Sequence, residues 1–138
     1  MKKHKVELRF CVSGFEDITH AELTNLFGIT PVKEYFKGLP INPKLSQGKL
    51  ATLNRWLICS PNFKVDDDFE MQMNGFIELA KNKTAVFNDI CKKYFCEFSC
   101  AIFSEAGIEM STPWIHLGDD YNTYFGKLNV HFDMDLYV

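Results

Sequence analysis

The segment HFDMDLYV, positions 131–138, holds the side chains of this chain that are best arranged for chemistry. If the segment is a strand, alternate side chains point to opposite faces, so His131, Asp133, Asp135 and Tyr137 share one face. The two carboxylates then lie roughly 7 Å apart, which suits an acid–base pair or two ligands of a divalent cation. One hypothesis is therefore a small-ligand-binding or metal-dependent enzyme that uses this polar face.

The same row of polar side chains is also typical of the solvent face of a half-buried strand. The chain contains no G-x-S-x-G, no glycine-rich phosphate loop, no H-E-x-x-H and no Cys–His signature. We therefore favour a surface that docks a partner over a catalytic site. We expect no catalytic residue, no metal ion and no cofactor.

Two other groups of metal-binding residue types have simpler explanations. The five cysteines include a C-x4-C-x3-C cluster that ends at Cys96 and Cys100, without the C-x2-C turn of a zinc site. We expect reduced, buried and unreactive thiols, since the chain shows no secretion signal. The run Asp66 to Asp68 is interpreted as the start of a helix, with Asp67 and Glu70 as a capping pair.

The composition favours one compact domain, residues 1–138. The chain of 138 residues is 46% hydrophobic and has 13 Phe, which predicts a core rich in phenylalanine. A net charge of −3 argues against nucleic-acid binding. No long apolar run follows the basic start, so we expect no membrane segment and a cytoplasmic location.

These residues must be positioned by a sheet and a set of helices. Alternation of apolar and polar residues predicts strands, and a helical stripe with capping residues predicts helices. The strands are expected at 5–13, 51–60, 95–103 and 129–138, and the helices at 17–28, 67–81, 84–94 and 119–128. This pattern predicts an α+β fold with a single, mostly antiparallel sheet of about four main strands, packed on one face by helices.

More detailed expectations follow for the two ends of the chain. In the first helix, Asp17 or Thr19 is the expected N-cap, Gly28 the C-terminal stop, and His20 a surface residue. The apolar residues of the last strand are expected to face the helices; they are Phe132, Met134, Leu136 and Val138.

Several short motifs, taken in order, carry a family resemblance. They are FGITP, a KG that seven residues separate from its Ile, a strand bearing Trp and the ending FDMDLYV. On these the chain resembles a family of small bacterial domains of unknown function, the one numbered four-two-seven-nine. The matching positions are Gly28, Pro31, Gly38, Trp56, Leu117, Asp133, Asp135, Leu136 and Tyr137. The resemblance implies a compact α+β domain and no established reaction or cofactor.

The function expected from the sequence is a non-enzymatic protein-binding module, such as an inhibitor or immunity-like protein. The expected contact residues are the polar row of the last strand and three aromatic residues in long connections, Tyr35, Phe36 and Trp114. Aromatic anchors with charged surroundings favour binding, and the acidic balance suggests a basic protein partner. The oligomeric state stays open.

Overall fold

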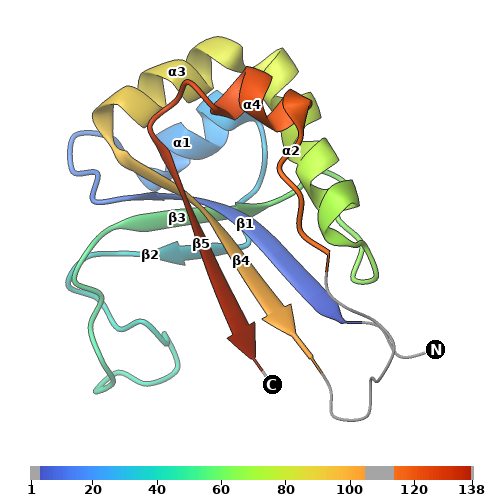
Figure 1. The fold of residues 1–138 in the computed structure, drawn as a ribbon. Coiled ribbons are helices and arrows are strands. Elements are labelled where there is room, and N and C mark those ends of the chain that lie inside the picture. The colour runs from blue at the N-terminus through green and yellow to red at the C-terminus, as the bar shows by residue number, and fades with distance from the viewer. Residues whose placement is uncertain (1–3, 105–113, 138) are drawn as a thin grey trace.

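The structure, a computed structural model, describes residues 4–104 and 114–137 and has the predicted α+β fold (Figure 1). Strands and helices alternate irregularly along the chain. In order they are β1 Lys5–Ser13, α1 His20–Phe27, β2 Lys33–Tyr35, β3 Arg55–Cys59, α2 Phe69–Asn82, α3 Thr84–Lys93, β4 Phe95–Phe103, α4 Asp119–Phe125 and β5 Val130–Tyr137.

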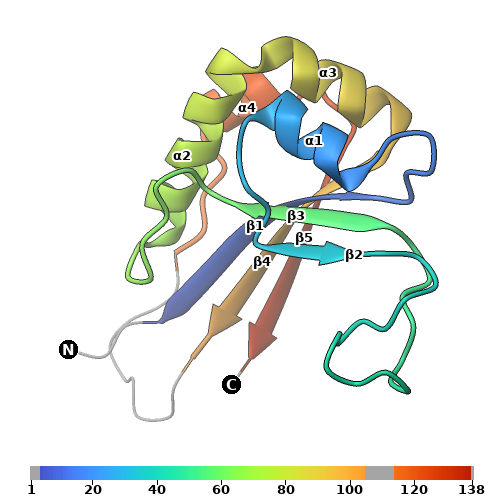
Figure 2. The same ribbon diagram turned by 180° about the vertical axis from the view of Figure 1, so that it is seen from behind.

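The five strands form one mixed sheet in the order β2-β3-β1-β4-β5. β1 lies in the centre and pairs antiparallel with β3 and β4, and β2 pairs antiparallel with β3. Among the strands of residues 4–104 and 114–137, only the β4–β5 pair is parallel. The four helices of the described residues cover the same face of the sheet, and none of them lies on the opposite face (Figures 1 and 2). The predicted fold class is confirmed, and β2 is a short addition inside the expected long connection.

Phenylalanine rings fill the space between the sheet and the helices, as the composition predicts. Phe10 of β1 packs edge-on against Phe87 and Phe98, with ring centroids 5.1 and 5.3 Å apart. Phe125 of α4 contacts the same two rings at 5.4 and 5.0 Å. All four side chains are at most 1% exposed, so one continuous aromatic core joins the central strands to two helices.

The ends of the first two helices follow local rules. Thr19 and Glu22 form a reciprocal capping box, and Gly28 ends α1 at φ 69°, a conformation that favours glycine. For α2, the N-cap is Asp68, whose side chain accepts a hydrogen bond from the Met71 N–H. The expected capping pair of Asp67 with Glu70 is therefore wrong by one residue, because Asp67 instead accepts the Lys64 N–H at 2.9 Å.

A buried glutamine on α2 forms hydrogen bonds with the backbone of β1 where β3 does not pair with that strand. β3 pairs with β1 only from Arg9 onward. Next to this gap, Gln72 Oε1 accepts the Leu8 N–H at 2.9 Å, and Gln72 Nε2 donates to the Val6 carbonyl at 2.8 Å. The same nitrogen donates to the Asp67 carbonyl at 2.9 Å. Gln72 is 0% exposed, so its amide satisfies backbone groups that water does not reach.

The apolar side of β5 is less covered than the sequence suggests. Phe132 packs against Phe69 of α2, with ring centroids 6.2 Å apart. Met134 and Leu136 are on the same side of the strand but are 48% and 60% exposed. The predicted orientation is confirmed, since Met134 and Leu136 lie beside the buried Cys100 and Ile102. The helices do not cover them, because β5 is the edge strand and its end extends past the helical layer (Figure 1). Val138 lies outside the described residues.

Candidate functional site

The helix-free face of β4 and β5 carries a row of carboxylates. The parallel register places Glu97 beside His131, Ser99 beside Asp133 and Ala101 beside Asp135. Because partners in register point to the same face, Glu97 joins the two aspartates there. We call Glu97, Asp133 and Asp135 the acidic patch. The predicted polar row of the last strand is thus brought together, with one carboxylate more than expected.

Two stacked aromatic pairs bound the acidic patch along the strands. His131 stacks on Phe95 with ring centroids 4.6 Å apart and planes 18° from parallel. At the other end, Tyr137 stacks on Phe103 at 5.0 Å and 11°. Phe95 is 46% and Tyr137 52% exposed. Ordered aromatic rings at both ends of a charged row supply contact area that loses little entropy on binding.

The charges of the acidic patch are unevenly compensated. Burial, followed by the Asp133 carboxylate, raises the pKa of Glu97 above its ordinary value, while Arg55 and His131 oppose the shift. In contrast, Asp133 and Asp135 form no ion pair within the described residues. The two aspartates are therefore the groups of the patch that can gain most from an external cation.

Tyr35 of β2 belongs to the same face of the sheet, with β3 and β1 between it and β4. Its ring lies under the Arg55 guanidinium, 5.5 Å from ring centroid to Cζ, and Arg55 also donates to Cys11 Sγ at 3.4 Å. Tyr35, Arg55, Phe95 and Glu97 line a hollow of about 430 Å³ beside the connection of residues 36–54. This hollow extends from Glu97 of the acidic patch toward β2, where the Arg55 guanidinium is held by Tyr35 and Cys11.

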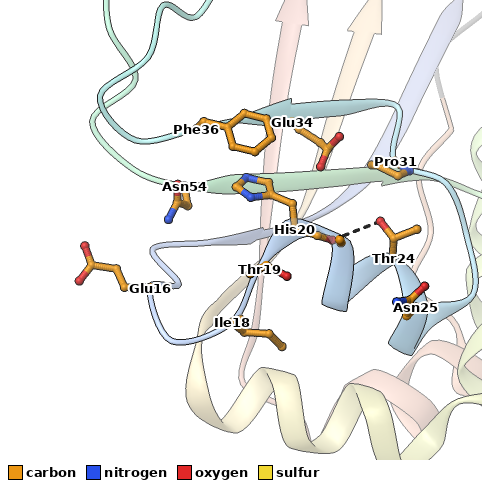
Figure 3. Close-up of a pocket in the computed structure, with 11 residues that line it drawn as sticks. Glu16, Ile18, Thr19, His20, Thr24, Asn25, Pro31, Glu34, Phe36 and Asn54 are labelled. Atoms are coloured by element: carbon orange, nitrogen blue, oxygen red, sulfur yellow. Dashed lines mark hydrogen bonds between the residues drawn. The ribbon is translucent and has the colours of Figure 1, made fainter.

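Phe36 lies on a different surface, in an open pocket of about 740 Å³ between α1 and the β2 edge (Figure 3). There it stacks on the His20 ring at 4.0 Å. Glu34 and Pro31 line the same pocket, as the labelled side chains of Figure 3 show. The structure therefore separates Phe36 from the acidic patch.

His20, expected at the surface, is only 7% exposed. Its Nε2 lies 2.7 Å from the Tyr35 carbonyl oxygen, and since a carbonyl oxygen only accepts, that nitrogen is a donor. The Thr24 hydroxyl donates to the His20 carbonyl at 3.2 Å, the dashed contact of Figure 3. In this arrangement the His20 side chain joins α1 to β2.

Trp114 lies on the helical side of the molecule. It is 63% exposed, stacks on His116 at 5.3 Å, and lines a pocket with Glu70 and Asp119. Of the three aromatic residues selected from the connections, only Tyr35 shares a face with the polar row of β5.

Metal-binding clusters and reactive thiols are the other chemical candidates in this chain. Within residues 4–104 and 114–137, no group of three or more His, Cys, Asp or Glu side chains is placed to hold a metal ion. Burial raises the pKa of the Cys100 thiol to about 11, and a hydrogen bond with Cys91 and burial raise that of Cys96. Both thiols are free and buried, a state with little thiolate to react at neutral pH.

Sequence reasoning missed Glu97, Phe95 and Arg55 as members of the site. Strand parity alone puts Phe95 and Glu97 on the polar side of FCEFSCAIF, so this signal was present. Parity does not say which strand lies next to β4, and the register of β5 beside it comes only from the structure.

The fold and the acidic patch define a small α+β domain, with a single mixed sheet covered by helices on one face and the acidic patch on the β4–β5 part of the other. The chain belongs to the family described as domain of unknown function (DUF4279), whose model matches residues 2–138. No curated protein and no solved structure matches the chain significantly. No helix formed by the described residues has the length and apolar character needed to cross a membrane.

Proposed function

We propose that this chain is a non-enzymatic protein-binding module, inhibitor or immunity-like in type, that docks a basic protein partner. The observation that supports it is the acidic patch between two ordered aromatic pairs, on a sheet face without helices. Asp133 and Asp135 are exposed and have no ion pair in the described chain, so a partner's lysine or arginine gains two carboxylates at once. The proposed place of action is the bacterial cytoplasm.

Exposed aromatic rings on this face also support the proposal. Phe95 and Tyr137 are half-exposed although they are stacked. A charged centre with aromatic flanks combines electrostatic guidance of the encounter with apolar contacts that slow dissociation. Tyr35 and the hollow beside it extend this surface toward β2.

The test compares two variants with the same change of net charge. Asp133→Asn with Asp135→Asn removes two charges from the acidic patch. Asp119→Asn with Asp120→Asn removes two from the first turn of α4. Binding is measured by surface plasmon resonance against purified products of the genes adjacent to the coding sequence. We expect one basic partner, whose association the patch variant slows several-fold and the α4 variant much less.

Salt dependence and stability complete this experiment. The deficit of the patch variant should shrink as salt rises, because screening weakens interactions between exposed charges. Its melting temperature should stay close to that of the parent, since exposed unpaired carboxylates add little to stability. Equal slowing by both double variants would show a general charge effect and contradict docking at the acidic patch.

The alternative is a small-ligand-binding or metal-dependent enzyme that uses the same face. The raised pKa of Glu97 favours it, because shifted carboxyl groups are frequent among catalytic acids and bases. Isothermal titration of the parent with Mg²⁺, Mn²⁺ or Zn²⁺ separates the two functions. Tight, stoichiometric binding that the Asp133→Asn, Asp135→Asn variant loses would replace the docking proposal with the enzyme.

A further inference from the structure

β5 has an outer edge that no strand of the described chain pairs with. The Tyr137 carbonyl accepts the Ser104 N–H at 2.9 Å, so the backbone groups of Tyr137 face β4. The N–H and C=O of one residue point to the same side of a strand, and successive residues alternate. The backbone groups of Phe132, Met134 and Leu136 therefore point outward, as a row of donors and acceptors.

The side chains next to this free edge differ between the two faces of the sheet. Asp133 and Asp135 are exposed on the helix-free face. On the helix side, Met134 and Leu136 are 48% and 60% exposed, and the end of β5 extends past the helical layer (Figure 1). An added strand would therefore have carboxylates beside one set of its side chains and aliphatic groups beside the other.

We propose that the β5 edge binds an extended segment of the basic partner as a sixth strand. The segment alternates lysine or arginine, beside Asp133 and Asp135, with aliphatic residues beside Met134 and Leu136. Backbone hydrogen bonds supply affinity in this mode of recognition, and alternate side chains supply specificity. The inference rests on the proposed function, since it names how the partner reaches the acidic patch.

Charge complementarity selects this partner over a second copy of the chain. When two β5 strands pair antiparallel with nearly full overlap, Asp133 lies opposite either Asp133 or Asp135 of the other copy. Like charges directly opposite each other destabilise a strand pair. A cationic strand turns the same two positions into attractive pairs.

The probe is a capped peptide of alternating lysine and valine, on the order of eight residues, the length of an ordinary strand. It is titrated into the ¹⁵N-labelled full chain, and amide hydrogen exchange is followed by NMR. We expect slower exchange at the Met134 and Leu136 amides, which face outward. A peptide with glutamate in place of lysine should not bind.

Two N-methylated forms of the peptide separate strand addition from charge attraction. Methyl groups on the N–H groups that face β5 should weaken binding about tenfold or more. Methyl groups on the alternate N–H groups leave that edge free and should keep the affinity. Both forms carry the same charge, and both are measured against the unmodified protein, so the comparison does not depend on a variant that folds.

A protein variant provides an independent measurement. Met134→Pro removes an outward N–H without removing a hydrogen bond to β4, and proline is tolerated at such edge positions. It should weaken binding of the unmodified peptide while Met134→Ala does so much less. Equal affinities of the two proteins would contradict strand addition.

The outcomes distinguish this inference from the function on which it rests. If both methylated peptides bind equally, and Asp133→Asn with Asp135→Asn weakens both, docking at the acidic patch stands and strand addition is wrong. If the two methylated peptides differ in affinity but the Asp133→Asn, Asp135→Asn variant binds the unmodified peptide as the parent does, strand addition stands. The proposed role of the acidic patch, and with it the cationic partner, is then wrong. Absence of binding at millimolar peptide, or exchange protection of Met134 that rises with protein concentration alone, overturns the inference.

Discussion

Replacing Gln72 by leucine should be among the most damaging single changes in this chain, although the volume and burial are nearly kept. Gln72 holds the Leu8 N–H and the Val6 carbonyl at 2.9 and 2.8 Å. Val6 and Leu8 are 6% and 1% exposed, so water does not replace the lost partner in the folded state. A third bond, to the partly buried Asp67 carbonyl, disappears as well.

The magnitude follows from the cost of buried polar groups without a partner. Each costs about 1–3 kcal/mol, and the gain from burying a leucine side chain offsets part of the total. We expect Gln72→Leu to lower the free energy of unfolding by about 3 kcal/mol, a large share of the roughly 5–15 kcal/mol of an ordinary domain.

Urea unfolding followed by circular dichroism measures this loss, with Asn74→Leu on the exposed side of α2 as the matched control. The control should stay within about 0.5 kcal/mol of the parent. Amide exchange should also accelerate at Leu8 in the Gln72 variant. If Gln72→Leu is as stable as the parent, with an unchanged dependence on urea, the glutamine does not support β1.

Gln72→Glu provides a second check with a defined sign. The carboxylate keeps an acceptor for the Leu8 N–H but cannot donate to either carbonyl. Burial raises the pKa of such a carboxyl, so the folded variant keeps its proton to higher pH than the unfolded chain. Its stability relative to the parent should fall as pH rises from about 4 to 7.

Three further predictions concern other buried or partly buried groups. A Cβ at Gly75 would overlap the Ser60 hydroxyl, so Gly75→Ala should lower the melting temperature, although alanine usually stabilises a helix relative to glycine. Adding Ser60→Gly to this variant should restore part of the loss. A higher melting temperature for Gly75→Ala alone would contradict the overlap. Because the folded-state pKa of Glu97 is raised, the stability of the parent should fall relative to that of Glu97→Gln as pH rises from about 4 to 7. Urea unfolding of both proteins across this pH range measures the effect. A difference in the free energy of unfolding that does not change with pH would refute the prediction. Cys96 and Cys100 should resist a thiol reagent in the native protein and react after unfolding. EDTA should leave the melting temperature unchanged. Rapid labelling of both thiols in the native protein would contradict their burial.

The elements whose signals lie within a few residues were predictable. Thr19, Glu22 and Gly28 delimit α1 by contacts inside one or two turns, and these are visible in the sequence. The alternation of β1 and β4 is confirmed in the same way, because period two follows from strand geometry alone. The predicted sheet with helices on one face follows from these local patterns.

The errors concern how elements lie next to one another. Alternation predicts that Met134 and Leu136 share a side of β5, but not that β5 is an edge strand beyond the helices. The burial of His20 depends on β2 and Phe36, although its spacing from Leu23 and Phe27 fits one helical stripe. Glu97 enters the acidic patch only through the parallel register with β5. Lateral order in a sheet is a long-range property, and a single sequence carries little of it.

The central position of β1 has a consequence for biosynthesis. Phe10 pairs with Ile58 on one side and with Phe98 on the other, so β1 is synthesised before either of the strands that pair with it. At ribosomal elongation rates of about 5–20 residues per second, the interval between Phe10 and Phe98 is on the order of ten seconds. During that time an alternating apolar strand is open on both edges, which is the condition that chaperones recognise and that leads to aggregation. The pairing edge of β1 that faces β4 therefore stays open until β4 has been translated.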